Sequence, residues 1–391
     1  MFDNIRGTLY GQGTGQPYGE DQYVLANKDD DEDNDAIVNF TPVGFSVTNS
    51  GYNVNTNGDT YIYMAIRRPH KPPTAASEVF ALNTRSGNET AITVTAGFPV
   101  DLAIIGARNV AHWTNVFDRL RGATNFMATQ VTNAETSYAN TLTGFDNNTA
   151  IEIGTDSTNL GVNRNSQTYH DYLFKRAPGF MDVVAFQGTG SARTLNHNLG
   201  AVPELVIVKN RENASYGWSV YVSHLSSPRT KAMYLNGTDG ASTNSEGTFW
   251  GSSDFTATQI YLGNYGNTNH SGKAMIAYMF ATLDGISKVG AYSGTGSNIN
   301  VDCGFSSGAR FVLIKRTDTE ISGDTGTHWY YWDSERGIIS GNDPYLMFSN
   351  TDSEVTNTDY IDPLSSGFTV TSSANAGINA DGGTYIFLAI A

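Results

Sequence analysis

An acidic run near the start of the chain holds the densest set of oxygen donors in the sequence. It spans Asn27 to Asp35 and reads NKDDDEDND. Clustered carboxylates could bind Ca²⁺, a hard cation that prefers oxygen ligands, although the run lacks the glycine-containing register of an EF-hand loop. The candidate ligands are Asp29, Asp30, Asp31 and Asp33. A solvated loop is the first interpretation, and calcium binding or contact with a basic neighbouring subunit are the alternatives.

A second candidate site is the aromatic run His328 to Ser334, which reads HWYYWDS. Alternate side chains of a strand share a face, so Trp329 and Tyr331 lie together on one side. Tyr330 and Trp332 lie on the other. An exposed aromatic pair could stack on sugar rings, which makes Trp329 and Tyr331 the candidate contacts for a glycan or a partner. The alternative is that both faces pack, because aromatic residues favour strands in general.

A third pattern pairs a carboxylate with a guanidinium in the order aromatic-Asp-x-x-Arg-Gly. It occurs as FDNIRG (Phe2 to Gly7), FDRLRG (Phe117 to Gly122) and WDSERG (Trp332 to Gly337). Such a pair could take part in chemistry. The preferred interpretation is a strand end followed by a turn, in which Asp accepts hydrogen bonds from backbone amides and Gly takes a positive φ.

Motifs of known catalytic or cofactor sites are absent from the sequence. It holds no HExxH, GxSxG, Walker A or Rossmann pattern, and GTG at 188–190 and 294–296 is predicted to be a hairpin-like turn. The seven His residues are scattered, and Cys303 is the one cysteine. We therefore expect no cofactor and no catalytic residues. Two carboxylates that cleave glycans stay an alternative, since the sequence does not show the distance between them.

Composition narrows the classes of partner. The net charge is -15, and 23 Lys and Arg residues dispersed among 38 Asp and Glu residues give no basic face for phosphates. We therefore expect neither nucleic-acid binding nor membrane insertion. No run of about eighteen apolar residues and no secretory signal is present, so we expect synthesis in the cytoplasm without Sec export. The 41 Gly residues and a charged fraction of 16% suit short strands joined by tight turns.

Internal repetition gives the elements that must position these residues. Four segments share a closing pattern, in which an Asn comes six residues before an apolar run. The four Asn residues are Asn55, Asn163, Asn269 and Asn379, and the runs open at Tyr61, Tyr169, Met275 and Tyr385. The opening halves also match, because the segments at 183–211 and 289–317 are alike. A polar turn that leads into a buried strand explains the closing pattern.

The repeat is about 105 residues long, close to the length of a small β-sandwich. We therefore predict an all-β fold of tandem β-sandwich-like repeats with little helix. The predicted units are 1–68, 69–178, 179–284 and 285–391. The apolar segments LAII, LVIVK and FVLIK, which begin at Leu102, Leu205 and Phe311, are predicted to be central strands.

The first unit holds only the second half of a repeat, since its FDNIRG pattern begins at Phe2. Three alternatives follow: the chain starts inside a longer protein, another subunit supplies the opening strands, or the half-unit has a reduced fold of its own. We expect strands from another chain or from an upstream segment to complete it by β-augmentation.

The segments YLFKRAPGFMDVVAFQGTG, LNHNLGAVPELVIVKNR and SKVGAYSGTG, with ARFVLIKRTD and the terminal GTYIFLAIA, resemble an uncharacterised repeat-domain family. That family is common in proteins of tailed phages, especially marine ones. The resemblance covers roughly residues 44–391. It implies a structural role in the virion, often described as a tail fibre, and it brings no catalytic residues.

We therefore expect a non-enzymatic virion structural protein, namely a tail fibre or surface appendage component with host-surface contact. The expected location is the exterior surface or tail of the particle. The expected partners are other virion proteins, further copies in a homo-oligomer and a host-surface glycan. Alternative functions are a capsid decoration or cement protein, a carbohydrate-binding receptor-recognition module and a glycan-cleaving spike.

Overall fold

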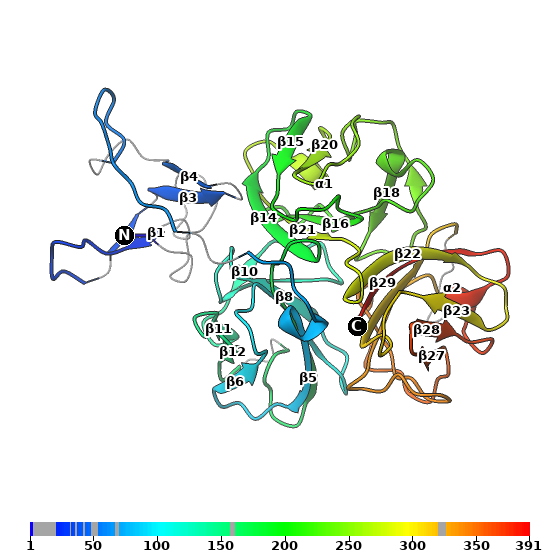
Figure 1. Cartoon of the computed structure of the whole chain (residues 1–391). Coiled ribbons are helices and arrows are strands. Elements are labelled where there is room, and N and C mark those ends of the chain that lie inside the picture. Colours follow the sequence, from blue (N-terminus) through cyan, green and yellow to red (C-terminus); the bar gives the residue numbers. More distant parts are fainter. Residues whose placement is uncertain are drawn as a thin grey trace.

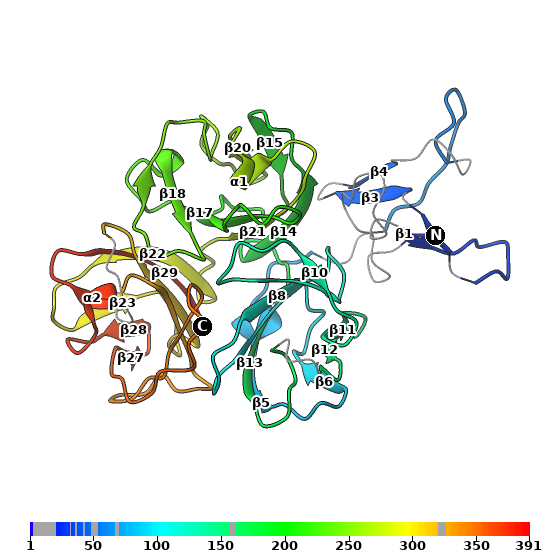
Figure 2. The same cartoon turned by 180° about the vertical axis from the view of Figure 1, so that it is seen from behind.

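Short antiparallel strands make up most of the computed structural model, which confirms the all-β prediction. The structure describes residues 1–2, 21–31, 33–35, 37–41, 44–47, 54–66, 70–156, 161–319 and 326–391. Three lobes gather around one centre, and the N-terminal unit lies to one side of them (Figure 1; seen from behind in Figure 2). The lobes follow one another in sequence, and we call them the first, second and third repeats.

The first repeat contains two sheets. The larger sheet has the order β10-β9-β8-β7-β13-β5, with β5 (Phe80–Ser86), β7 (Leu102–Ala107), β8 (Thr114–Asp118), β9 (Asn125–Ala128), β10 (Thr136–Ser137) and β13 (Thr168–Phe174). The smaller sheet has the order β11-β12-β6, with β6 (Ile92–Thr95), β11 (Leu142–Gly144) and β12 (Ala150–Ile153). A 3-10 turn, η1 (Ala76–Glu78), precedes them.

The second repeat has the same plan. Its larger sheet has the order β14-β21-β16-β17-β18-β19, with β14 (Met181–Gln187), β16 (Leu205–Asn210), β17 (Ser219–Val222), β18 (Lys231–Tyr234), β19 (Ser242–Thr243) and β21 (Ala274–Phe280). Its smaller sheet pairs β15 (Arg193–Asn196) with β20 (Gln259–Leu262). A 3-10 turn, η2 (Pro228–Thr230), precedes β18, and one helical turn, α1 (Gly266–Asn269), precedes β21.

The third repeat follows the plan again. Its larger sheet has the order β22-β29-β24-β25-β26, with β22 (Ser287–Ser293), β24 (Phe311–Arg316), β25 (Trp329–Asp333), β26 (Leu346–Met347) and β29 (Thr384–Ile390). Its smaller sheet has the order β23-β28-β27, with β23 (Ile299–Asp302), β27 (Ile361–Leu364) and β28 (Gly367–Val370). The helical turn α2 (Ala376–Asn379) precedes β29. Every named strand pair of these sheets lies within one predicted repeat.

The predicted central strands are central, and their register is the same in the two long C-terminal repeats. β16 lies between β21 and β17, and β24 lies between β29 and β25. Asn210 is paired with Met275, and Arg316 is paired with Tyr385 at the corresponding place. The prediction that Tyr385 occupies the position of Met275 is therefore confirmed. The closing strand of each repeat is hydrogen-bonded on both sides.

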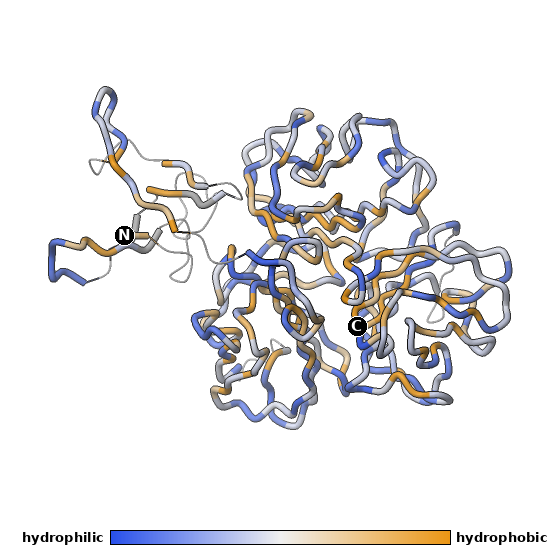
Figure 3. The backbone as a smooth tube through the Cα atoms, viewed as in Figure 1, coloured by the Kyte–Doolittle hydropathy of each residue, from blue (hydrophilic) through white to orange (hydrophobic). Residues whose placement is uncertain are grey.

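Each larger sheet buries both faces, which explains why its strands read as nearly continuous apolar runs. One face packs inside the sandwich of its own repeat. The other face packs into one core to which all three repeats contribute. Hydrophilic residues dominate the outer loops (Figure 3). We call residues 75–391, joined by this shared core, the three-repeat head.

One backbone hydrogen bond recurs at each junction between repeats and closes the head into a ring. The amide of Glu135 donates to Arg211 at 2.6 Å, which joins the first repeat to the second. The second repeat joins the third through Ala241 and Thr317 at 2.8 Å, and the third joins the first through Glu354 and Arg108 at 2.7 Å. The three repeats are thus related cyclically, as the subunits of a closed trimer would be.

The Asn of the closing pattern ties the two halves of each repeat together, and we call this set of bonds the Asn clamp. Asn379 accepts a hydrogen bond from the amide of Thr295 at 3.0 Å. Its amide group donates to Ser297 at 2.9 Å and to Thr371 at 2.8 Å. The equivalent residues are Asn88, Thr90 and Gly154 for Asn163, and Thr189, Ser191 and Gly263 for Asn269. In the second and third repeats, the middle residue of the GTG turn therefore donates the backbone hydrogen bond to the clamp Asn.

The described part of the N-terminal unit consists of two small hairpins and an extended segment. β1 (Asp21–Tyr23) pairs with β2 (Asp33–Asp35), and β3 (Val38–Thr41) pairs with β4 (Gly44–Val47). The expected closing strand at 61–66 belongs to no sheet of the described residues, and Ile62 in it is 99% exposed. The FDNIRG pattern lies outside the described residues beyond Phe2.

Across the described ranges, no helix is long and apolar enough to span a membrane.

The clamp predicts that Gly294 tolerates no side chain, because a Cβ atom there would lie 2.1 Å from the carbonyl oxygen of Ala380. The Gly294→Ala change should lower the free energy of unfolding by about 2–3 kcal/mol, as expected for overpacking against backbone. Denaturant unfolding measures it. The control is Gly237→Ala, whose nearest neighbour would lie at 3.5 Å and whose cost should stay below about 1 kcal/mol. Equal costs for the two variants would contradict the interpretation.

Candidate functional site

The two described Asp-x-x-Arg-Gly patterns form the predicted turn. The carboxylate of Asp118 accepts a hydrogen bond from the amide of Arg121 at 3.0 Å, and that of Asp333 accepts one from Arg336 at 2.9 Å. The glycine that follows has φ of 88° at Gly122 and 118° at 337. The turn interpretation is confirmed, and each aspartate also forms an ion pair with the arginine of its own turn.

The side chains of the first such turn hold the junction between the first and second repeats. Asp118 accepts a hydrogen bond from the hydroxyl of Tyr278, in the second repeat, at 2.7 Å. Arg121 forms an ion pair with Glu135 at 3.0 Å. Glu135 in turn binds Arg211 of the second repeat at 2.7 Å. Two carboxylates, two guanidinium groups and one phenol therefore form a single cluster across the junction.

The third and first repeats meet through an equivalent cluster. Asp333 accepts a hydrogen bond from the hydroxyl of Tyr172 at 2.6 Å. Arg336 forms an ion pair with Glu354 at 3.2 Å, and Glu354 binds Arg108 of the first repeat at 2.9 Å. The same five residue types thus occupy the same places at two of the three junctions.

The junction between the second and third repeats lacks all five polar groups. Sheet register and the repeated backbone bond identify the equivalent positions. They are held by Val222, Leu225, Ala241, Thr317 and Leu388. All five residue types are present at two junctions, and all five are replaced at the third. We therefore treat the five residues as one cluster.

Charge balance makes burial of each cluster tolerable. Asp118 and Arg121 have no exposed side-chain surface, and an isolated buried charge would cost several kcal/mol. Burial alone would raise the pKa of Glu135, but the guanidinium groups of Arg211 and Arg121 outweigh it and hold the pKa below its usual value. Glu135 therefore stays ionised between the two guanidinium groups.

His170 of the first repeat is buried at the junction with the third repeat. Its imidazole Nε2 lies 3.0 Å from the hydroxyl of Tyr331. The ring takes the space beside Gly106, where a Cβ atom would lie 2.4 Å from Nε2. The positions equivalent to Gly106 are lysines in the other repeats, Lys209 and Lys315, and each donates to a carbonyl of the preceding repeat. Burial, aided by the charge of Arg336, holds the pKa of His170 well below its usual value.

The aromatic residues singled out as glycan or partner contacts lie inside the protein. Trp329 and Tyr331 face the shared core, and Tyr330 and Trp332 face the core of the third repeat. The indole of Trp329 donates to the carbonyl of Tyr234 in the second repeat at 2.9 Å. Neither Trp329 nor Tyr331 presents surface to a ligand in this fold, and both faces of β25 pack, as the alternative interpretation expected.

The described part of the acidic run lies after β1, in the segment that leads to β2, and within β2 itself. Asp29, Asp30 and Asp31 are exposed, and Asp30 lies 3.3 Å from the ammonium group of Lys28. Asp33 belongs to β2. Among the residues that the structure describes, no group of His, Cys, Asp and Glu is arranged to hold a metal ion.

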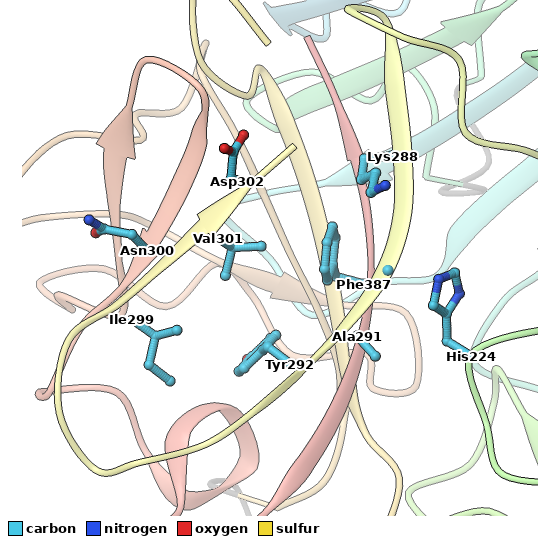
Figure 4. Close-up of a pocket in the computed structure, with 10 residues that line it drawn as sticks. His224, Lys288, Ala291, Tyr292, Ile299, Asn300, Val301, Asp302 and Phe387 are labelled. Carbon is cyan, nitrogen blue, oxygen red and sulfur yellow. The ribbon is translucent and has the colours of Figure 1, made fainter. Parts of the chain in front are cut away.

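A pocket of about 290 Å³ opens between the edge strands β22 and β23 of the third repeat. Figure 4 shows Lys288 and Asp302 on facing strands, the ring of Phe387 between them and His224 of the second repeat at the side. Tyr292 closes one end. The carboxylate of Asp302 accepts one hydrogen bond, from the amide of Gly304 at 2.9 Å.

The second repeat has different chemistry at the position that corresponds to Lys288. The second repeat has Asp182 in the place of Lys288, and this carboxylate is used by Arg176 at 2.6 Å and by the amide of Asn198 at 2.7 Å. The pocket thus offers a cation, a carboxylate and an aromatic surface in a small concavity. That mixture suits a small polar ligand of about the size of a sugar unit.

The three-repeat head is also the part of the chain that a family model recognises. The model is described as Domain of unknown function (DUF7483), and it matches residues 75–391. The chain belongs to the DUF7483 family. No curated protein matches the chain. The matched region begins before η1 of the first repeat and contains all three junctions of the DUF7483 head.

Sequence reasoning missed what the Asp–Arg pairs of the DUF7483 head contact. It also missed Glu135, Glu354, Tyr172 and Tyr278, because none of them stands in a recognisable motif. A signal was present in the repeats themselves. Only the second repeat lacks the Asp-x-x-Arg pattern, and only the third repeat has a leucine, Leu388, at the position of the two tyrosines.

The clusters predict that one substitution lowers the free energy of unfolding more than the joint substitution of all five residues does. Asp118→Asn removes one of the two carboxylates that pair with the buried Arg121, leaves the buried cluster with an excess positive charge, and should cost about 3–5 kcal/mol of unfolding free energy. The joint variant copies the second–third junction, and it carries D118V, R121L, E135A, R211T and Y278L. It should lie within about 2 kcal/mol of the parent, because uncharged side chains replace the whole buried cluster and leave no buried charge unpaired. Denaturant unfolding measures both, and a joint cost larger than the single one would contradict the cluster interpretation.

The environment of His170 predicts a loss of stability in acid. The folded-state pKa lies below the unfolded value of about 6.5, so below that pH the unfolded chain binds a proton that the folded chain does not. Between pH 7 and pH 5 this should lower the unfolding free energy by up to about 2 kcal/mol. His170→Gln should remove that part of the pH dependence. The same change at the exposed His224 is the control, and an unaltered pH dependence in His170→Gln would show the prediction wrong.

Proposed function

We propose that the chain is a non-enzymatic structural component of a tailed-phage virion, on the exterior surface or tail, as a fibre or appendage. The observation that carries the proposal is the location of the side chains that could take part in chemistry. The Asp and Arg residues of the repeated turns, which could take part in chemistry, lie at junctions between repeats, where they are paired and buried. The resemblance of the repeats to phage proteins supplies the setting.

The geometry supports a scaffold in a second way. A shared core and three recurrent backbone bonds join the repeats, so force applied to one lobe is distributed to the others. Asp118 and Asp333 each have a guanidinium partner and no exposed surface, which leaves them unsuited to act as a hydrolytic pair. A rigid, inert head of this kind suits a particle exterior.

Within the same role, a capsid decoration or cement protein is the alternative location. The carbohydrate-binding function has its own observation, the pocket that contains Lys288 and Asp302. Host-surface contact is proposed there, since Trp329 and Tyr331 are buried.

The proposal is tested on purified particles of the phage that encodes the chain. Mass spectrometry should find the chain in particles, and gold-labelled antibodies against the full chain should mark tails or surface appendages. Labelling of the head shell would select the decoration role. Absence from purified particles, with the chain present in the lysate, would contradict a virion role altogether.

The pocket is tested with a panel of host-surface glycans. Lys288→Ala should reduce any glycan binding by about tenfold, the loss of one charge-assisted hydrogen bond. Lys71→Ala, at an exposed position far from the pocket in sequence, is the matched control and should change nothing. Equal binding by both variants would remove the pocket from the proposal. Release of reducing ends from the same glycans would contradict the non-enzymatic role.

A further inference from the structure

Two nearly identical heptapeptides in this chain lie in opposite environments. Residues 60–66 read TYIYMAI, and β29 (Thr384–Ile390) reads TYIFLAI. β29 is an interior strand of its sheet, paired with β22 on one side and β24 on the other. Residues 60–66 are paired with no strand of the described chain, and Ile62, Met64 and Ile66 are 99%, 84% and 84% exposed. The copy in β29 shows directly what covers this sequence when it is buried.

The turn before residues 60–66 contains a hydrogen bond that also occurs in two of the complete repeats. The hydroxyl of Tyr61 accepts a hydrogen bond from the amide of Thr56 at 2.8 Å. Tyr385 accepts the equivalent bond from Ala380 at 2.7 Å, and Tyr169 accepts it from Arg164 at 2.8 Å. The segment is therefore preorganised locally, which lowers the entropy that a partner must overcome.

No described residue fills the Asn clamp of this unit. Asn55 stands at the position of Asn379, six residues before the tyrosine, but it is exposed. In the third repeat the clamp is filled by the turn after β22, through the amide of Thr295 and the carbonyl of Ser297. The strand and the clamp thus lack the same partner, namely the opening half of a repeat.

We propose that residues 54–66 are a docking strand for another polypeptide chain that supplies the opening half of a repeat. The partner would add one strand on each edge of residues 60–66, as β22 and β24 do for β29, and its Gly-rich turn would fill the clamp of Asn55. This is β-augmentation on both edges of one strand. The inference depends on the proposed function in one respect only, namely which assembly contains the partner chain.

The side chains specify which kind of opening half fits. Opposite Phe387 in β29 stands Gly290, where a Cβ atom would lie 2.4 Å from the ring. Tyr63 holds the position of Phe387, so the partner strand needs a glycine opposite Tyr63. The second repeat has Val184 there, opposite Ala277, and its opening half would clash.

Pairing between two copies of the exposed segment is a poorer fit. Two such segments could pair edge to edge, which would cover one edge of each and leave the clamp of Asn55 open. A repeat-opening half covers both edges and the clamp at once. The proposed occupant is therefore the one that satisfies every open group of the segment.

The test uses the full chain and a probe peptide that copies residues 285–318, the opening half of the third repeat. Addition of the probe should protect the amides of residues 60–66 from hydrogen exchange. Asn55→Ala in the full chain should weaken binding of the probe by about tenfold. A probe with the Gly290→Val change is the matched control and should give no protection.

The remaining outcomes each overturn the proposal. No protection by the probe, free or fused ahead of residue 1, would show that the segment does not accept an opening half. Protection by the fused probe alone would show that the strands belong to the same chain and not to a partner. Protection of the full chain without probe that rises with protein concentration would show pairing between copies. All of these results are independent of whether the chain is found in phage particles.

Discussion

A buried cluster of two carboxylates, two guanidinium groups and a phenol joins neighbouring repeats at two of the three junctions of the head. At the first–second junction it joins Asp118 and Arg121 to Tyr278, and at the third–first junction it joins Asp333 and Arg336 to Tyr172. Each charge is buried only because its partner comes from the neighbouring repeat or turn. The larger sheets can then bury both faces, one in their own sandwich and one in the shared core.

The three junctions differ in chemistry, and this difference favours one order of the repeats around the ring. Repeats of similar sequence could pair in the wrong order or with other copies of the chain. A junction that placed a charged turn against an apolar partner would leave a buried charge unpaired, which costs several kcal/mol. The apolar second–third junction and the two charged junctions therefore favour one cyclic arrangement. This is a structural and a selective role for the side chains of the clusters.

The sequence predicted the strands of the repeats well, because apolar runs, Gly-rich turns and a period of about 105 residues are local signals. It placed β16 and β24 at the centre of their sheets and the Asp of each turn as an amide acceptor. It did not predict the clusters, because Tyr278 lies 160 residues from Asp118 and no local pattern joins them. It named Trp329 and Tyr331 as candidate contacts since alternation shows that two residues share a face and not what covers that face. The pocket near Lys288 was missed because its residues come from separate strands.

The central claim is that residues 75–391 form one cooperative unit and not three independent sandwiches. Calorimetric unfolding of the full chain, with hydrogen exchange to assign each transition to its repeat, tests this most directly. The account predicts a single transition for the three repeats, with a calorimetric enthalpy equal to the van't Hoff enthalpy. Three separable transitions, or a calorimetric enthalpy about three times the van't Hoff value, would contradict it.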